Sequence, residues 1–496
     1  MKKCIVLSEN TYSPTTTIRT LYRNIGAMEV VKRFRAQGVK TTHLEWVGSW
    51  KHSDLESTIE TYFSNSTQQY IAISVTFSLE NVINLRPVLD NLRVKFPNVK
   101  IIVGGNRNHD NRLNDFIDYV FLGRSMEMLD AWIQDEDMHQ FATDNPQVLI
   151  NQNIKFDYDV PVIPEICDED LLNSKDILGF EIGIGCKFNC SFCGYPLRGT
   201  KDPLLVESER IREFLQGAYD RYGVHNFYIA DDTLNEQDVK LEILANAVEA
   251  LTYEPNIVCY FRIDLLDSRP QQVELLKRCK LKGLNLGIET LTPAAAKTVR
   301  KTGKVGKIVN ALKQVKEHSP QSYVGTGMII GLTGDTKEQL YNNINYLKDE
   351  KLVHAISPYN LTIETSKSGV YEQSYLSEFA KNPERFGYTI ERDLEDELRD
   401  SRPNHTTTLA WVNDWTNHEE AYDITQDILE NLRNESFPIT TAFEWIILLA
   451  MNAVKDVSES KLAGNGHVWS AMEARIGKHK NLYIANKIAQ IQEEVQ

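Results

Sequence analysis

The sequence predicts an α/β protein in which a doubly wound N-terminal domain and a partial barrel of parallel strands are followed by a C-terminal helical region. Two series of short apolar segments, each alternating with segments of helical spacing, lead to this prediction; they occupy residues 1–140 and 176–368. Residues 141–175 are rich in Pro, Asp and Asn, lack clear periodicity and are interpreted as a linker. Residues 369–496 show mainly helical spacing and predict a helical cap.

Five apolar segments predict the strands of the first domain. They are KCIVLS, KTTHLEW, YIAISVTF, KIIVGG and DYVFLG. The third is apolar almost throughout, which is typical of a strand buried on both faces of a parallel sheet. Because helical segments separate the strands, we expect a Rossmann-like open sheet whose ligands bind at the carboxyl ends of its strands. Those ends carry residues 8–17, 76–79 and 104–106.

The second series predicts a partial TIM-type barrel. Six segments of strand character alternate with helical ones: LGFEIGI, NFYIADD, VCYFRID, LNLGIET, YVGTGMIIG and HAISPYNL. Six β/α units in succession favour a (β/α)6 barrel, whose functional residues lie at the carboxyl ends of the strands. We expect the C-terminal region, with Trp411, Trp415 and Trp445, to cover the barrel mouth; core packing is the alternative role of these tryptophans.

The composition narrows the class of protein. The 496 residues include 54 basic and 69 acidic side chains, and the net charge of −15 argues against a chain that mainly binds nucleic acid. The N-terminus MKKCIVLSEN predicts a strand rather than a signal peptide. The apolar segment FEWIILLAMNAV is interrupted by Glu444 and Asn452 and predicts a buried helix, not a membrane span. We therefore expect a cytoplasmic protein with reduced cysteines.

Three cysteines stand close together in GIGCKFNCSFCGYPLRG, residues 183–199. They are Cys186, Cys190 and Cys193, and they follow the first predicted barrel strand. Three thiolates can ligate three irons of a [4Fe–4S] cluster and leave the fourth iron open to another ligand. The pattern therefore favours a cluster with a binding site rather than a closed electron-transfer cluster.

Two alternative roles of these cysteines remain open. A structural zinc ion would need a distant fourth ligand such as Cys167 or His225, although zinc ligands usually come as two close pairs. A coincidental group of core cysteines does not suit the polar residues between them, Lys187, Asn189 and Ser191.

The segment CKFNCSFC, a CxxxCxxC pattern with an aromatic residue before the last cysteine, resembles the signature of radical S-adenosylmethionine (SAM) enzymes. The segments FYIADDTLN, FRID, GLNLGIET and GMIIGLTGDTKEQL are similar to later strands of the subgroup that carries an N-terminal cobalamin-binding domain. The resemblance spans about residues 1–365. It implies that SAM binds the open iron and that an electron from the reduced cluster splits it into methionine and a 5′-deoxyadenosyl radical.

The same resemblance implies cofactors, partners and reactions. The cofactors would be a [4Fe–4S] cluster, SAM and, in this subgroup, cobalamin, and an electron donor such as flavodoxin or ferredoxin would supply the electron. One implied reaction is cobalamin-dependent methylation of an unactivated carbon. The alternatives are a non-methylating radical reaction beside a vestigial first domain, and a non-catalytic metal or iron–sulfur protein.

The resemblance assigns four residues to the cluster loop. Cys186, Cys190 and Cys193 would ligate the cluster. Phe192 stands where the family has an aromatic residue beside the adenine, and simple packing would account for it equally well.

Polar residues at two strand ends would meet the methionine part of SAM. Asp231 and Asp232 end the second barrel strand, where the family places groups that contact the methionine amino group; a helix N-cap role is the alternative for one of them. Arg262 and Asp264 alternate on the third strand and would reach the methionine carboxylate or the ribose.

The fourth and fifth barrel strands complete the implied SAM site. Glu289 ends the fourth strand and would face the ligand. In GMIIG, the residues Gly327, Ile329 and Gly331 match a G-x-I-x-G pattern whose backbone pairs with adenine. Glycines at such positions permit close approach of the backbone.

The first domain departs from the family in one respect. Cobalamin domains that supply a histidine to cobalt carry a D-x-H-x-x-G motif after the first strand, and the corresponding loop here, SENTYSPTTTIRT, has no histidine. His43 and His52 lie elsewhere and are interpreted as ordinary strand or surface residues. The sequence thus predicts either cobalamin bound without a protein histidine on cobalt or a domain that binds none.

The remaining cysteines are scattered. Cys4, Cys167, Cys259 and Cys279 are interpreted as small buried hydrophobic residues, and only Cys259, on a barrel strand, is a candidate catalytic thiol. No second cysteine cluster follows Cys279, so no auxiliary iron–sulfur cluster is expected.

Overall fold

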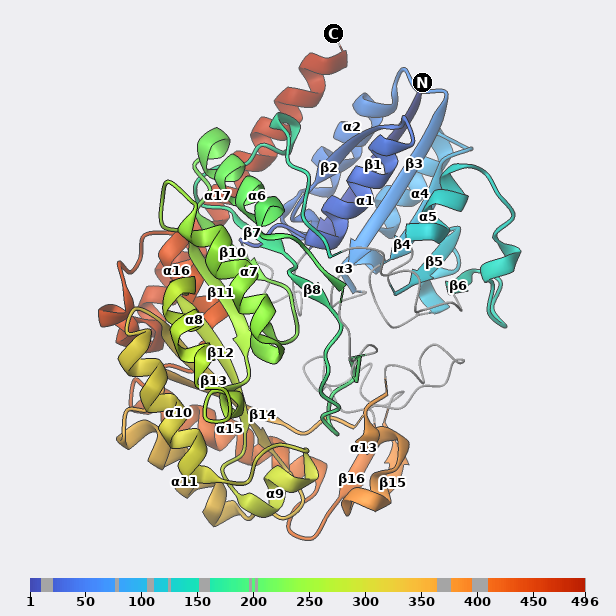
Figure 1. Cartoon of the computed structure of the whole chain (residues 1–496). Coiled ribbons are helices and arrows are strands. Elements are labelled where there is room, and N and C mark those ends of the chain that lie inside the picture. The colour runs from blue at the N-terminus through green and yellow to red at the C-terminus, as the bar shows by residue number, and fades with distance from the viewer. Residues whose placement is uncertain are drawn as a thin grey trace. The chain divides into compact units, whose positions relative to one another are not determined.

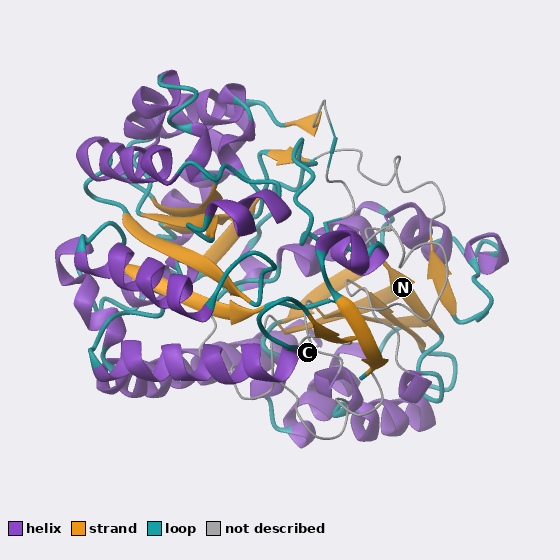
Figure 2. Ribbon diagram, turned by 90° about the horizontal axis from the view of Figure 1, so that it is seen from below, coloured by secondary structure: helices purple, strands orange, loops and turns teal. Residues whose placement is uncertain are grey.

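The computed structural model of the chain describes residues 1–9, 21–75, 80–104, 111–123, 126–150, 161–195, 199–200, 204–363, 376–394 and 409–495. These residues form two compact units. The first contains residues 1–180, 218–224 and 471–496, and the second contains 181–217 and 225–470. Each unit is built around a parallel β-sheet with flanking helices (Figures 1 and 2).

The sheet of the first unit has six parallel strands in the order β2-β1-β3-β4-β5-β6. The strands are β1 (Lys2–Glu9), β2 (Lys40–Leu44), β3 (Gln68–Val75), β4 (Lys100–Gly104), β5 (Tyr119–Leu122) and β6 (Val148–Ile150). The five predicted strands are confirmed. The sixth, β6, was not predicted, because its three residues lie in the segment interpreted as a linker.

Helices cover both faces of this sheet (Figure 1). They are α1 (Ile25–Ala36), α2 (His52–Phe63), α3 (Glu80–Ile83), α4 (Arg86–Lys95) and α5 (Met126–Ile133), with short 3-10 turns at η2 (Val47–Ser49), η3 (Asn111–Leu113), η4 (Met138–Phe141) and η5 (Asp168–Asp170). Helices α1 and α5 contact each other, as do α2 and α4. The third strand is buried on both faces as expected, with Tyr70 to Ile73 at most 3% exposed.

The strand order makes the first unit a doubly wound sheet of the flavodoxin-like type. The order reverses between β1 and β3, and ligands of such sheets bind at that point, beyond the carboxyl ends of the strands. The loops that the sequence singled out there fall largely outside the described residues: only 8–9 and Gly104 are described, not 10–17, 76–79 or 105–106.

A long helix near the C-terminus contributes to the first unit. Helix α17 (Gly466–Val495) places residues 471–495 in that unit. The Arg23 guanidinium donates to Asp176 at 2.8 Å and lies 4.6 Å from the ring centroids of both Trp46 and Tyr483. His479 lies 3.1 Å from the other oxygen of Asp176. Helix α17 therefore packs against the first unit through the buried Arg23 guanidinium and the Asp176 carboxylate.

The second unit contains the parallel strands predicted for the barrel. Their order is β14-β13-β12-β11-β10. They are β10 (Asn226–Ile229), β11 (Asn256–Phe261), β12 (Gly283–Glu289), β13 (Tyr323–Ile330) and β14 (Ala355–Asn360). The first predicted barrel strand is present as two shorter ones: β7 (Ile177–Phe180), which falls within the first unit, and β8 (Gly183–Ile184), which pairs with β9 (Leu204–Leu205).

Helices follow these strands in turn, as a partial barrel requires. They are α6 (Ser208–Tyr222), α7 (Asp238–Glu249), α8 (Gln271–Cys279), α9 (Pro293–Thr298), α10 (Val305–His318) and α11 (Lys337–Asp349), with 3-10 turns at η6 (Leu234–Glu236) and η7 (Ile263–Leu265). The region after residue 376 contains α13 (Glu378–Lys381), η8 (Pro383–Phe386), α15 (His418–Asn434), α16 (Ala442–Ala450) and η9 (Val457–Gly464). It also contains an antiparallel pair, β15 (Thr389–Asp393) and β16 (Leu409–Val412), which its helical spacing did not predict.

Helix α16 is the buried helix that FEWIILLAMNAV predicted, and it closes the amino half of the strands. It contacts β10 to β13. Gly283 and Gly287 lie on the same face of β12, because side chains alternate along a strand. A Cβ at Gly283 would lie 3.1 Å from Ala442 of α16, whereas Gly287 lines a cavity further along. The start of α16 thus forms the floor beneath that cavity.

The three tryptophans of the C-terminal region pack against other parts of the second unit. Trp445 stacks on Tyr323, the first residue of β13, with ring centroids 4.6 Å apart. Trp411 is fully buried, and the Trp415 indole donates to the carbonyl of Leu332. None of the three lines the cavity. Core packing, the alternative role, fits their positions.

A buried cation with two carboxylates positions the cysteine loop. Lys240 of α7 lies 2.5 Å from Asp231 and 3.0 Å from Glu236, and all three side chains are fully buried. Asp231 accepts hydrogen bonds from the backbone N–H groups of Ile182 and Gly183, before the loop.

The second carboxylate of this triad holds the other side of the loop. Glu236 accepts a hydrogen bond of 2.7 Å from the N–H of Lys187, the residue after Cys186. Burial alone would lower the pKa of Lys240, but the carboxylates of Asp231 and Glu236 outweigh it and hold that pKa above its ordinary value. The loop that carries Cys186 is therefore fixed on both sides by one charge network.

Replacing Lys240 by methionine should destabilise the chain by about 3–5 kcal/mol, because two buried carboxylates lose their cation. Urea denaturation followed by circular dichroism measures the change. The matched control is Lys282→Met, which removes a partly exposed pair with Glu254 and should cost about 1 kcal/mol or less. Equal losses in the two variants would contradict the role given to Lys240.

Candidate functional site

A cavity of about 460 Å³ lies within the second unit, at the carboxyl ends of β10 to β14. All three cysteines of the loop line it. Its other walls are mainly aromatic and carry a few charged groups: Phe188, Phe192, Tyr195, Tyr260, Phe261, Tyr359, Asp232, Arg262, Glu289 and Lys301. A concave, largely apolar pocket with a few convergent polar groups is typical of a small-molecule site.

The cysteine loop is closed by backbone hydrogen bonds. The N–H of Cys193 donates to the carbonyl of Cys190 at 3.2 Å, and Thr200 donates to Cys186 at 3.1 Å. Phe379 donates to the carbonyl of Ser191 from a distant part of the chain. The three thiols are therefore held in a compact loop at the cavity wall.

The thiols differ in their surroundings. Cys186 is buried, and burial raises its pKa to about 12. The Cys193 sulfur accepts a hydrogen bond from the N–H of Tyr195 at 3.3 Å. The Cys190 sulfur lies 3.5 Å from a guanidinium nitrogen of Arg262. Since metal ligation deprotonates thiols, a nearby cation and N–H donors suit these sulfurs to a bound metal cluster.

Arg262 is held in place on every side. Its guanidinium makes a bidentate ion pair with Asp264, at 2.8 and 3.1 Å, and lies 3.9 Å from the ring centroid of Phe188. The fully buried side chain of Asn235 binds both the N–H and the carbonyl of Arg262. Burial opposes the charge, but Asp264 and the cysteines hold the pKa of Arg262 above its ordinary value.

Glu289, Lys301 and Tyr359 form a second polar group at the opposite wall. Lys301 donates to Glu289 at 2.8 Å, and the Tyr359 hydroxyl donates to the other carboxylate oxygen at 2.6 Å. Glu289 adopts a left-handed backbone conformation with φ of 65°, which costs about 1–3 kcal/mol for a non-glycine residue. Tyr359 is 42% exposed because it faces the cavity. Backbone strain such as that at Glu289 is often found at functional sites.

Two features indicate that the cavity is shaped for a ligand. The Asn285 side-chain oxygen is buried at the cavity wall and has no hydrogen-bond partner among the described residues. Buried acceptors are normally satisfied, so a donor on a ligand would complete it. A Cβ at Gly287 would lie 2.6 Å from the Lys301 ammonium, and one at Gly327 would lie 2.9 Å from the Tyr359 ring. Only glycine leaves these walls open.

The structure brings together five of the nine residues predicted for SAM and separates the rest. Those lining the cavity are Phe192, Asp232, Arg262, Glu289 and Gly327. Asp231, Asp264, Ile329 and Gly331 do not line it.

Each residue outside the lining has a structural partner instead. Asp231 is committed to Lys240 and to the backbone before the loop, and Asp264 is committed to Arg262. Ile329 is 1% exposed. Gly331 has φ of 102°, and a Cβ there would lie 2.4 Å from the Trp411 ring, so packing explains this glycine.

Sequence reasoning missed Asn285, Lys301 and Tyr359. The period of two along β14 offers a signal for one of them, since Ser357 and Tyr359 share a face and both line the cavity. Lys301 follows a short helix, α9, and no local pattern indicates that it returns to Glu289.

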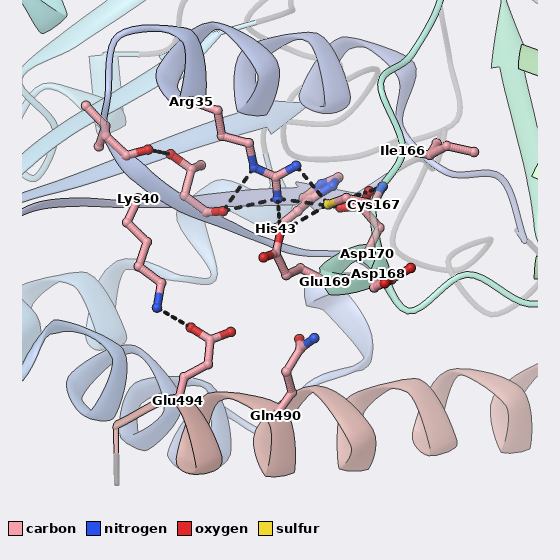
Figure 3. A network of polar contacts seen from close by, with 12 residues as sticks. Arg35, Lys40, His43, Ile166, Cys167, Asp168, Glu169, Asp170, Gln490 and Glu494 are labelled. Carbon is pink, nitrogen blue, oxygen red and sulfur yellow. Dashed lines mark hydrogen bonds and ion pairs between the residues drawn. The ribbon is translucent and has the colours of Figure 1, made fainter. Parts of the chain in front are cut away.

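The scattered cysteines take no part in the cavity. Cys259 is fully buried, and burial raises its pKa well above the ordinary value, so the candidate catalytic thiol is a core residue. Cys167, in the first unit, is half-buried; Figure 3 shows Arg35 donating to its sulfur, at 3.0 Å, and Glu169 beside it. His225 immediately precedes β10 and so lies at the amino end of the strand, away from the cysteine loop.

Within the described part of the chain, no three His, Cys, Asp or Glu side chains gather as they would around a single metal ion. A [4Fe–4S] cluster spreads its thiolates over separate irons instead.

His43, which lies in β2, is bonded to Ser8 at 2.8 Å, and burial lowers its pKa to about 3. It is thus a core strand residue, as expected. Among the described helices, none is long and apolar enough to cross a membrane.

Comparison with known proteins agrees with this site. Residues 180–347 match the family model described as the radical SAM superfamily. A ribosomal protein uS12 methylthiotransferase, RimO, of Carboxydothermus hydrogenoformans is 23% identical over 301 residues, which are 57% of this chain and 62% of that protein. The hopanoid C-2 methylase of Rhodopseudomonas palustris is 23% identical over 231 residues, 45% of this chain and 42% of that protein. The chain thus spans about half the length of these curated relatives.

Solved structures show the fold. The radical SAM methyltransferase TsrM from Kitasatospora setae, solved with tryptophan substrate and a SAM analogue, has a TM-score of 0.62 at 12% identity, covering 98% of this chain and 100% of that one. The cobalamin-dependent radical enzyme OxsB, solved with aqua-cobalamin and SAM, has a TM-score of 0.59 at 12% identity, covering 100% and 80%. The chain therefore carries a radical SAM domain at residues 180–347, within a fold that it shares with TsrM and OxsB.

Proposed function

We propose that the chain is a radical SAM enzyme that holds a [4Fe–4S] cluster on Cys186, Cys190 and Cys193 and cleaves SAM reductively in the cavity of the second unit. The observation that carries the proposal is the cavity itself, which is lined by all three cysteines together with fixed charges and an unsatisfied acceptor. When bound, a reduced cluster with an open iron supplies the electron that breaks a sulfonium C–S bond of SAM.

The chain's own residues bind and orient in this proposal. Arg262 offsets the negative charge of the cysteine thiolates and is itself fixed by Asp264. Asp232 offers a carboxylate to the methionine ammonium, and Phe192 offers a ring to the adenine. Glu289, held by Lys301, offers its carboxylate to a hydroxyl or ammonium group of the ligand. The aromatic walls exclude water from the reacting atoms.

We further propose cobalamin-dependent methylation of an unactivated carbon as the reaction. TsrM, solved with cobalamin and a [4Fe–4S] cluster, has a TM-score of 0.64 over 97% of this chain, so the doubly wound unit is included in the shared fold. The strand order of that unit supports a ligand at the β1/β3 switch point. The hopanoid C-2 methylase among the relatives fits the same class of reaction. The alternative is a non-methylating radical reaction beside a first unit that binds no cobalamin.

The reductant in this proposal is a small redox protein such as flavodoxin or ferredoxin. Radical SAM chemistry requires a one-electron donor, and the sequence holds no second close group of cysteines for an auxiliary cluster that could store an electron. None of the seven cysteines forms a disulfide, which fits a reducing compartment, and we place the chain in the cytoplasm.

Replacing Cys186, Cys190 or Cys193 by alanine should remove the cluster and SAM cleavage while leaving the far-ultraviolet circular dichroism spectrum unchanged, because the loop lies at the edge of a strand core. Iron and sulfide analysis after anaerobic reconstitution checks the result. Cys167→Ala, in the other unit, is the control and should keep full iron content. Full iron occupancy in any of the three loop variants would sink the cluster assignment.

Glu289→Gln should weaken SAM binding roughly tenfold or more without loss of iron, because a charged hydrogen bond contributes on the order of 1.5–3 kcal/mol. Isothermal titration of SAM into the reconstituted protein measures the affinity. Glu317→Gln, whose side chain is 75% exposed, is the matched control and should bind SAM normally. An unchanged affinity in Glu289→Gln would remove this residue from the SAM site.

If the first unit binds cobalamin, the cobalt should carry no protein histidine, since the loop at residues 8–20 contains none. The paramagnetic resonance spectrum of the reconstituted cob(II)alamin form checks this expectation. Nitrogen superhyperfine splitting from a lower axial imidazole would refute it. Failure to retain cobalamin while the cluster stays intact would favour the alternative reaction without methylation.

A further inference from the structure

A basic segment of the sequence stands out in this acidic chain. Residues 290–316 contain seven Lys and Arg residues and no Asp or Glu, whereas the whole chain has a net charge of −15. The segment covers α9, the turn after it and most of α10. A local concentration of one sign of charge is a feature that attracts a partner of the opposite sign.

The first half of the segment lies against the cysteine loop. An Arg300 guanidinium nitrogen donates to the carbonyl of Asn189 at 3.1 Å, and the Arg300 carbonyl lies 3.5 Å from the guanidinium of Arg262. Asn189 is an exposed residue of the loop and directly precedes Cys190. Lys297 is joined to this point, because the N–H of Arg300 donates to its carbonyl at 3.2 Å. The basic segment therefore contacts the cysteine loop at an exposed residue next to Cys190.

Some of these charges are already engaged. Lys301 is paired with Glu289, Lys307 is paired with Asp267, and Arg300 lies 3.7 Å from Glu378. Lys297 and Lys304 are exposed, and within the described ranges their ammonium groups make no ion pair or hydrogen bond. These two cations remain available to a partner.

We propose that the surface formed by Lys297, Arg300 and Lys304 is the docking site of the acidic one-electron carrier that reduces the cluster. The inference rests on the proposed function and deepens it by placing the reductant on this chain. Docking moves one electron and makes or breaks no bond: the carrier is oxidised by one electron, and the cluster on the adjacent loop is reduced by one. Complementary charge speeds and orients such an encounter.

The position of the surface favours this occupant over a nucleic acid. Electron transfer between proteins slows steeply with distance, so a carrier must approach the cysteine loop, and Arg300 of the basic surface contacts an exposed residue of that loop, Asn189. A nucleic-acid footprint usually extends along a whole basic face, whereas two exposed lysines and an arginine make a small contact.

The test uses the double variant Lys297→Glu/Lys304→Glu in the reconstituted full-length protein. Its matched control is Lys277→Glu/Lys313→Glu, which makes the same charge change at two exposed lysines in the later turns of α8 and α10, towards the amino ends of the strands. Binding of oxidised flavodoxin is measured by isothermal titration at low and high salt. SAM cleavage is then measured with reduced flavodoxin and, separately, with dithionite.

In the Lys297→Glu/Lys304→Glu variant, flavodoxin affinity should fall about tenfold at low salt, and this loss should become smaller at high salt. The control variant should bind flavodoxin with normal affinity. SAM cleavage driven by flavodoxin should fall in parallel, and cleavage driven by dithionite should stay unchanged. This last measurement separates the two proposals, because a wild-type protein that fails to cleave SAM with dithionite contradicts the proposed function instead.

Two results would overturn the docking site. One is equal flavodoxin affinity in the variant and the wild type, or an equal loss in the variant and its control. The other is unchanged flavodoxin binding together with a loss of binding to a transfer RNA probe, which would assign the surface to nucleic acid.

Discussion

The buried ammonium of Lys240 is the interaction on which the site depends. A loop with three cysteines has no regular structure of its own, so its geometry must be imposed from outside. Lys240 gathers Asp231 and Glu236, and their remaining oxygens bind the backbone on either side of Cys186. A network of this kind stabilises only when every charge is paired, and here each carboxylate also receives backbone N–H donors. The strand ends and the loop are thereby held in register before any cofactor binds.

Much of the fold could be predicted from the sequence because its strands and helices follow simple periods. The apolar segments indicated the strands of both sheets, and FEWIILLAMNAV indicated a buried helix. Periodicity does not say which surface a helix covers, and α16 lies beneath the cavity rather than over a mouth. The β15–β16 pair and the three-residue β6 were missed because strands this short do not contain enough residues for a period of two to be recognised.

The candidate site was predicted in part, for a reason that Asp231 and Asp232 illustrate. The sequence predicts both residues at the end of one strand, but β10 ends at Ile229 and the two carboxylates follow it with different surroundings. Asp232 lines the cavity, whereas Asp231 meets a lysine nine positions later. That partner looked like an ordinary helix residue, since only the tertiary structure shows it to be buried. Lys301 and Tyr359 were missed for the same reason: they meet Glu289 from separate elements.

Helix α17 has a consequence for how the protein is made. Arg23, Trp46 and Asp176 complete their buried contacts with residues 479 and 483, and residues 181–470 are synthesised in between. Domains usually fold in order as they leave the ribosome. The first unit cannot complete its folding in that order. The buried ion pair of Arg23 and Asp176 is covered by α17, which is synthesised after the whole second unit. During synthesis its sheet is therefore exposed longest where α17 will pack, and this surface is where a nascent chain would need protection by a chaperone.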